Sequence, residues 1–175
     1  MHVTLRIVPG VGYLRTQVRT RVIEEAMRIA RELHGVRIVH YSNQGNHLHL
    51  IVEACGAESL SRALQGLAIR LAKRLNALTG RHGSVFADRY HAHVLASPRE
   101  TVRAVRYVLG NYRHHTREHL PPRWEDPHSS ARFLRGALPE DAPVAPPRTW
   151  LLRVGWRRKT ADLARAMAVS SSDRG

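Results

Sequence analysis

The sequence has 175 residues, 43% of them hydrophobic, which is enough for one domain with a core and an appendage. It carries 28 lysine and arginine residues against 14 acidic ones, and this excess favours a polyanionic partner such as nucleic acid, although an arginine-rich solvated surface gives the same composition. No apolar run is long enough to span a membrane, no signal-peptide pattern opens the chain, and the single Cys55 excludes an internal disulfide, so we expect a cytoplasmic protein.

The first third of the chain predicts a strand, a helix and a hairpin. Residues 2–8 alternate apolar and polar side chains, as in a strand, and a helix follows from a cap at Thr16 to about residue 34. Residues 36–42 and 47–53 predict two paired strands, because the residues between them are typical of a tight turn.

A second helix is predicted over about residues 58–78. Its apolar side has the spacing of a buried helical stripe and consists of Leu60, Leu64, Leu67, Leu71, Leu75 and Leu78. Its basic side chains point away from that stripe, and we expect them to contact the DNA backbone: Arg70, Lys73 and Arg74.

A fourth strand over residues 90–96 and a helix over 98–114, with Ser97 as its cap, complete the predicted domain. The order β-α-β-β-α-β predicts an α+β, ferredoxin-like (RRM-like) fold, an antiparallel sheet with helices on one face, followed here by an extra C-terminal helix. Most of the nine prolines lie beyond this helix, so we expect an irregular tail with a docked segment around Trp150–Trp156. We therefore divide the chain into a domain, 1–116, and a Pro-rich extension of unknown role, 117–175.

The third predicted strand carries a histidine pair. On a strand, His47 and His49 project from one face while Leu48 and Leu50 enter the core. Two imidazoles at this spacing suit a divalent metal that keeps open positions for a phosphate. Two surface histidines would give the same pattern, and the chain has a second such pair, His91 and His93.

The last predicted helix places a tyrosine away from its apolar side. With 100° per residue, the apolar side consists of Val102, Val105, Leu109 and Tyr112. Tyr107 falls nearly opposite, in line with Arg103, Asn111 and His114. A ring lying on the surface would satisfy this pattern by itself.

Together, the two motifs suggest a reaction. A phenol can attack phosphorus and form a phosphotyrosine, and nearby arginine charge favours the phenolate. A metal held by His47, His49 and the amide oxygen of Asn111 would polarise the scissile phosphate. Besides Arg103, we expect Arg106 on this helix to contact DNA.

Three runs in this order, GNHLHLIVEA, GSVFADRYHAHVL and YVLGNYRHH, resemble the REP-associated tyrosine transposases, which belong to the HUH single-tyrosine transposases of bacterial insertion sequences. The resemblance covers about residues 1–116. It implies a ferredoxin-like catalytic fold, Mg²⁺ or Mn²⁺, and hairpin-forming single-stranded DNA that is cleaved and rejoined through a covalent 5′-phosphotyrosine. The family's histidine motif maps onto His47 and His49, its nucleophile onto Tyr107, and its third metal-binding side chain onto Asn111. Many members follow that asparagine with proline, where this chain has Tyr112.

Two alternatives stay open. An HUH relaxase or replication initiator uses the same chemistry, although the small size without a helicase domain favours a transposase. A non-catalytic, domesticated ferredoxin-like protein would bind nucleic acid as RNA-recognition modules do, yet only 6% of the chain is aromatic, and histidines suit a metal better than a base. The sequence does not distinguish a monomer from a homodimer.

Overall fold

The computed structural model describes residues 1–116, 119–121, 124–158 and 160. Its main elements follow the predicted order: β1 (His2–Arg6), α1 (Gln17–Ala30), β2 (Val36–Asn43), β3 (His47–Ala54), α2 (Ala57–Thr79), β4 (His91–His93) and α3 (Pro98–His115). Short helical turns are η1 (Pro9–Val11), η2 (Ser130–Phe133) and the π-helical η3 (Leu151–Gly155). No helix in the described part of the chain is both long and apolar enough to cross a membrane.

The four strands form one antiparallel sheet in the order β2-β3-β1-β4. In the register of the sheet, Thr4 of β1 lies between His49 and His91, and His2 lies between Ile51 and His93. Cross-strand partners project to the same side of a sheet. The register therefore gathers histidines from three strands on one face.

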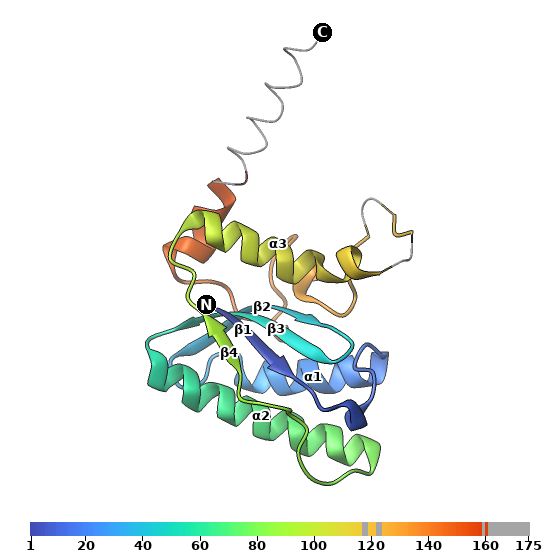
Figure 1. The fold of residues 1–175 in the computed structure, drawn as a ribbon. Coiled ribbons are helices and arrows are strands. Elements are labelled where there is room, and N and C mark those ends of the chain that lie inside the picture. Colours follow the sequence, from blue (N-terminus) through green and yellow to red (C-terminus); the bar gives the residue numbers. More distant parts are fainter. Residues whose placement is uncertain (117–118, 122–123, 159, 161–175) are drawn as a thin grey trace.

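The sheet lies between two helical layers (Figure 1). Helices α1 and α2 cover one face, where the main core includes Val3, Leu5, Leu48 and Leu50. Helix α3 covers β2 and β3 on the opposite face, where Ile51 joins a second apolar cluster. The predicted α+β fold, with α1 and α2 on one face of the sheet and α3 as the extra C-terminal helix, is thus confirmed.

Local signals account for the helix positions. The Thr16 side chain accepts a hydrogen bond from the backbone N–H of Arg19, and Ser97 caps α3 in the same way. The leucine stripe of α2 is buried from Leu60 to Leu75, but Leu78 at its last turn is 41% exposed. Strand β4 is shorter than predicted.

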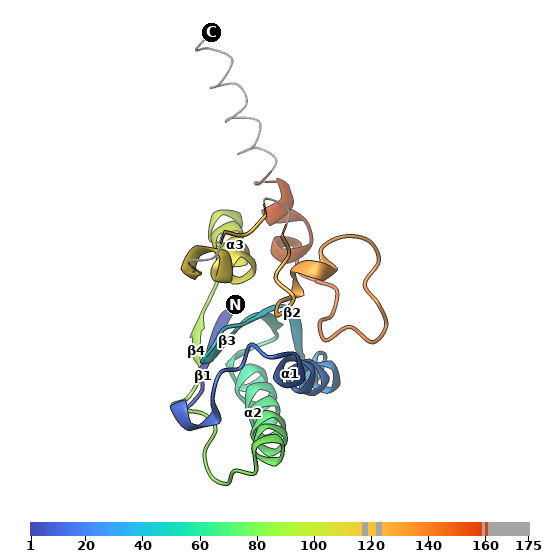
Figure 2. The same ribbon diagram turned by 90° about the vertical axis from the view of Figure 1, so that its right-hand side faces the viewer.

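The Pro-rich extension packs onto the domain. Its Ala142 and Val144 belong to the main core, and the backbone N–H of Ala145 donates to the carbonyl of Ile38 on β2 at 2.8 Å. Leu152 of η3 joins the cluster under α3, and η3 lies beside α3 (Figure 2), as expected for a docked segment. The described part of the extension therefore shares one core with the residues before it.

Candidate nucleophile and metal site

Tyr107 lies at the edge of the contact between α3 and the sheet. Its ring centroid is 5.2 Å from that of His49 and 5.8 Å from that of His2, and both contacts are edge-on. The side chain is 44% exposed. The tyrosine predicted to lie away from the apolar side is thus exposed, but it also borders the histidines of the sheet.

The histidine pair of β3 lies beside Tyr107. The rings of His47 and His49 are 4.6 Å apart and nearly perpendicular. His49 is buried, whereas His47 is half-buried. The two imidazoles therefore share one side of the strand, as the sequence predicted, while Leu48 and Leu50 lie in the core.

Hydrogen bonds orient both rings through Nδ1. Nδ1 of His49 lies 3.1 Å from Thr4 Oγ1 and 3.1 Å from His2 Nε2, and Nδ1 of His47 lies 2.7 Å from Asn46 Oδ1. The amide oxygen only accepts, so the Nδ1 of His47 carries the hydrogen. Metal-binding histidines are commonly held this way by a partner on the second ring nitrogen, so Nε2 is the atom of each ring that suits a metal.

Asn111 occupies the next turn of α3 and is 2% exposed. Its Nδ2 is buried and has no hydrogen-bond partner within the described residues. Rotation of the amide exchanges nitrogen and oxygen, which would place an acceptor at this unsatisfied position, where a cation could be held. Among the described residues no group of three or more His, Cys, Asp or Glu side chains converges, so an ion here would depend on two imidazoles and an amide, with further positions for water or phosphate. These residues fit a divalent cation.

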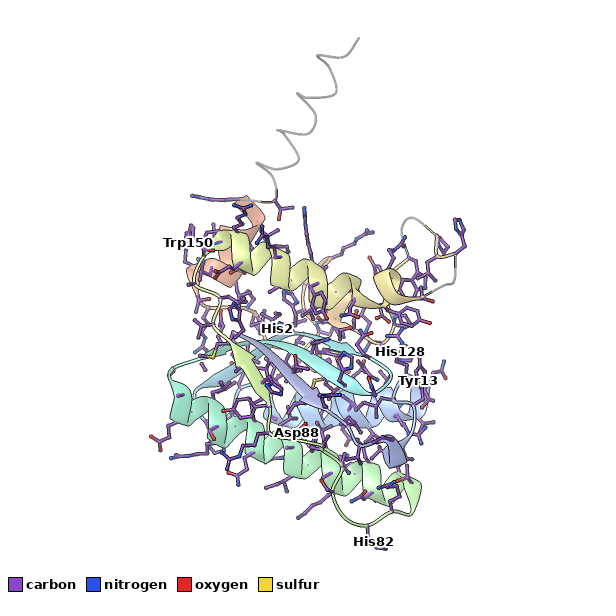
Figure 3. All side chains as sticks on the ribbon, viewed as in Figure 1. His2, Tyr13, His82, Asp88, His128 and Trp150 are labelled. Carbon is purple, nitrogen blue, oxygen red and sulfur yellow. The ribbon has the colours of Figure 1, made fainter. Side chains whose placement is uncertain are left out.

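His2 is a member of this site that sequence reasoning missed. It lies on the α3 side of β1 (Figure 3). Burial lowers its pKa, and the charge of the facing His93 lowers it further, so the neutral imidazole prevails near neutral pH. A single histidine at the start of a strand gives no signal by itself, because only the pairing of β1 with β3 brings it to His49.

The second histidine pair, His91 and His93, shares this face of the sheet but lies on the edge strand β4 and is exposed. Strand β1 separates it from β3. The structure thus brings His47 and His49, and not His91 and His93, together with Tyr107.

The predicted DNA-binding residues fall on two faces. Arg103 and Arg106 are exposed on α3, beside Tyr107. The α2 residues lie across the sheet from Tyr107 (Figure 1), where Arg74 pairs with Glu25 at 2.9 Å, Arg70 donates to a carbonyl of its own helix at 3.1 Å, and Lys73 is exposed. DNA contacts by both sets remain predictions.

A buried clamp holds the end of α3. The Arg15 guanidinium carbon lies 3.5 Å from the ring centroid of Tyr112, and both of its terminal nitrogens bind the Asp126 carboxylate, at 2.9 and 3.0 Å. The Arg15 and Asp126 side chains are 4% and 1% exposed. Tyr112 directly follows Asn111, so the clamp fixes the helical turn that carries the candidate ligand.

One comparison with a solved structure agrees with this architecture. No family model matches the sequence, and no curated protein matches it. A solved structure of a REP-associated tyrosine transposase bound to a REP hairpin is 15% identical, with a TM-score of 0.56 over 85% of this chain and 87% of that one. A protein assigned as a transposase from Deinococcus radiodurans R1 is 13% identical, with a TM-score of 0.44 over 59% of this chain and 85% of that one. The first of these similarities shows that the chain has the fold of a REP-associated tyrosine transposase.

Proposed function

We propose that the protein is a DNA transposase of the HUH single-tyrosine type, which cleaves and rejoins hairpin-containing single-stranded DNA. The observation that carries the proposal is an exposed tyrosine, Tyr107, packed 5.2 Å from one member of a close histidine pair. The shared fold with a transposase that was solved bound to a REP hairpin supports DNA as the substrate.

The reaction uses the Tyr107 hydroxyl as the nucleophile. Its oxygen attacks the phosphorus of the scissile phosphodiester, and the bond from phosphorus to the 3′ oxygen breaks. The phosphate stays on Tyr107 as a 5′-phosphotyrosine. The phenolic proton passes to solvent, and the 3′ oxygen takes a proton from solvent and leaves as a hydroxyl. Attack by a second 3′-hydroxyl on the phosphotyrosine rejoins DNA and releases Tyr107, so no nucleotide cofactor is needed.

We further propose that His47, His49 and Asn111 hold Mg²⁺ or Mn²⁺, which would withdraw negative charge from the phosphate. The contacts to Nδ1 of each histidine and the unsatisfied buried amide of Asn111 support this assignment. Arg103 and Arg106 on the same helix would contact the bound phosphate.

A labelled single-stranded hairpin with unpaired flanks, incubated with the protein and Mg²⁺ or Mn²⁺, tests the proposal. The wild type should give a covalent adduct that survives SDS, and Tyr107→Phe should lose the adduct but keep its affinity for DNA, because only one oxygen is removed. Tyr13→Phe is a matched control, since Tyr13 is 55% exposed and lies in the loop between η1 and α1 rather than on α3.

An adduct that persists in Tyr107→Phe, or that maps to another tyrosine, would refute Tyr107 as the nucleophile. Binding by the wild type without any adduct, with either metal, would favour the non-catalytic alternative. Cleavage confined to plasmid or phage origins would favour a relaxase or replication initiator.

A further inference from the structure

The solvent side of α3 carries a stripe of arginines. The members, which recur at helical spacing and are all exposed, are Arg99, Arg103, Arg106 and Arg113. Tyr107 lies at the edge of this stripe. Such a row of guanidinium groups suits the regularly spaced phosphates of a nucleic-acid strand.

Next to the stripe, the extension and α3 line an open cavity of about 330 Å³. Its side-chain lining includes Arg106, Leu109, Arg113, Trp124 and Trp156. We call this cavity the tryptophan groove. Its volume lies within the range of small-ligand pockets, roughly 300–1,000 Å³.

The lining of the tryptophan groove indicates the kind of ligand. Leucine and two indoles provide a mostly apolar surface, which suits a flat ring better than a lone phosphate, and guanidinium groups lie at the same cavity. Two acidic residues also line it, but both are paired with arginines, Asp126 with Arg15 and Glu125 with Arg135. Proteins that bind single strands without reading their sequence combine these two features, a basic track for the backbone and aromatic rings on which bases stack.

Both indoles are held in place before any ligand arrives. Trp156 donates from its ring nitrogen to the Leu152 carbonyl at 2.8 Å, and its ring lies edge-on to His40. The Trp124 ring packs 5.7 Å from Tyr112, which the Arg15 clamp fixes. A preorganised surface lowers the entropic cost of binding.

The tryptophan groove is also within reach of the nucleophile. Arg106, which lines it, directly precedes Tyr107 on α3, so the groove and Tyr107 lie on neighbouring sides of one helix, within its diameter of about 10–12 Å. A strand attached at Tyr107 covers that distance in a few nucleotides, since each nucleotide adds ~3.4 Å even when stacked.

We propose that the tryptophan groove binds a base of the single-stranded DNA flank while the arginine stripe binds its phosphates. The DNA ligand rests on the proposed function, but the groove can be tested without the cleavage reaction. Paired bases in a duplex are stacked on each other, so the groove accepts an unpaired base.

Intrinsic fluorescence provides the test, because the chain has three tryptophans and one of them lies outside the groove. Trp150 is 55% exposed at the other end of α3 (Figure 3), with its ring against Gly155. Three proteins, each keeping one tryptophan with the other two changed to Phe, are prepared in the Tyr107→Phe background and titrated with hairpins that have or lack a single-stranded flank.

The flank should quench the emission of the Trp124-only and Trp156-only proteins and leave the Trp150-only protein unchanged. Trp124→Ala should weaken binding of the flanked hairpin about 5- to 150-fold, the factor that corresponds to the loss of one stacked base, whereas Trp150→Ala should not weaken it. Melting curves identify variants that fail to fold. Arg106→Gln removes a guanidinium that lines the groove, and Arg153→Gln is its control outside the groove, so this pair tests the groove with all three tryptophans present.

Equal quenching of the Trp150-only protein, or a flank that adds no affinity, would overturn the proposal. An RNA flank that quenches as strongly as DNA would overturn the assignment to DNA. The adduct assay on the wild type separates the two proposals. An adduct in the wild type, without flank-dependent quenching in the Tyr107→Phe proteins, would refute only the base-binding groove. Quenching in those proteins, without an adduct in the wild type, would refute only the nuclease.

Discussion

His40 on β2 should make the stability of the protein depend on pH. It is buried where the extension meets the sheet, with Nδ1 3.4 Å from Ser130 Oγ and its ring edge-on to Trp156. Burial, and to a smaller extent the charge of Arg157, lowers its pKa from 6.5 to about 4. Protonation of His40 therefore opposes the folded state.

The magnitude and the pH window follow from this shift. Between pH 6.5 and pH 4 the unfolded chain binds a proton at His40 that the folded chain does not, so the free energy of unfolding falls as the pH falls through that window. Each pKa unit corresponds to about 1.4 kcal/mol, which gives a loss of about 3 kcal/mol, complete near pH 4. Above the unfolded pKa the contribution is fully present.

Urea unfolding of the wild type and of His40→Gln at a series of pH values measures this effect. Burial also lowers the pKa of His2 and His128, but both proteins retain these groups, so the difference between the two curves isolates His40. The wild type should lose about 3 kcal/mol more than the variant on acidification. His82→Gln, at an exposed loop position, should follow the wild type. Parallel curves for wild type and His40→Gln would refute the reasoning.

Other parts of the structure give further expected outcomes. His47→Ala and His49→Ala should each abolish cleavage and weaken Mn²⁺ binding, which electron paramagnetic resonance measures. His91→Ala should reduce both only mildly. An equal loss in His91→Ala would indicate that the metal site includes the edge strand. Arg15→Met leaves a buried carboxylate unpaired and should lower the free energy of unfolding by about 3–5 kcal/mol in denaturant titrations, so a change below about 1 kcal/mol would show that the clamp is not buried in solution. Alanine at the three basic residues of α2, Arg70, Lys73 and Arg74, should weaken the salt dependence of DNA binding. The slope of log affinity against log salt should flatten by about 0.7 for each phosphate that the protein no longer neutralises. An unchanged slope would show that DNA binds only on the α3 side.

Local patterns predicted most of the fold. The caps at Thr16 and Ser97 and the leucine stripe of α2 depend on neighbours within a few residues, so they can be identified from the sequence. Leu78 was expected in the buried stripe of α2 but is 41% exposed. It lies at the last turn of the helix, and periodicity indicates the side of a helix that is buried but not how far its partner extends.

The site was predicted only where it depends on local geometry. His47 and His49 share a face because alternate residues of any strand do. The contacts of His49 with His2 and Thr4 required the register of β1 with β3, and the Arg15–Asp126 pair joins residues 111 positions apart. A helical wheel assumes one buried side, but α3 is covered by both the sheet and the extension, so Asn111 is buried although it was aligned with exposed residues.

The shared core has a consequence for synthesis on the ribosome. A growing chain that has released α3 already carries Tyr107, His47, His49 and Asn111, but Asp126, Ala142 and Val144 have still to emerge. At ~5–20 residues per second, this interval lasts on the order of seconds. During this interval Arg15 lacks its ion-pair partner Asp126, and the β2 side of the core is not yet covered. We expect a prematurely terminated product to have all the reactive side chains without the packing that aligns them, and so to be a substrate for proteases rather than a nuclease that cuts without control.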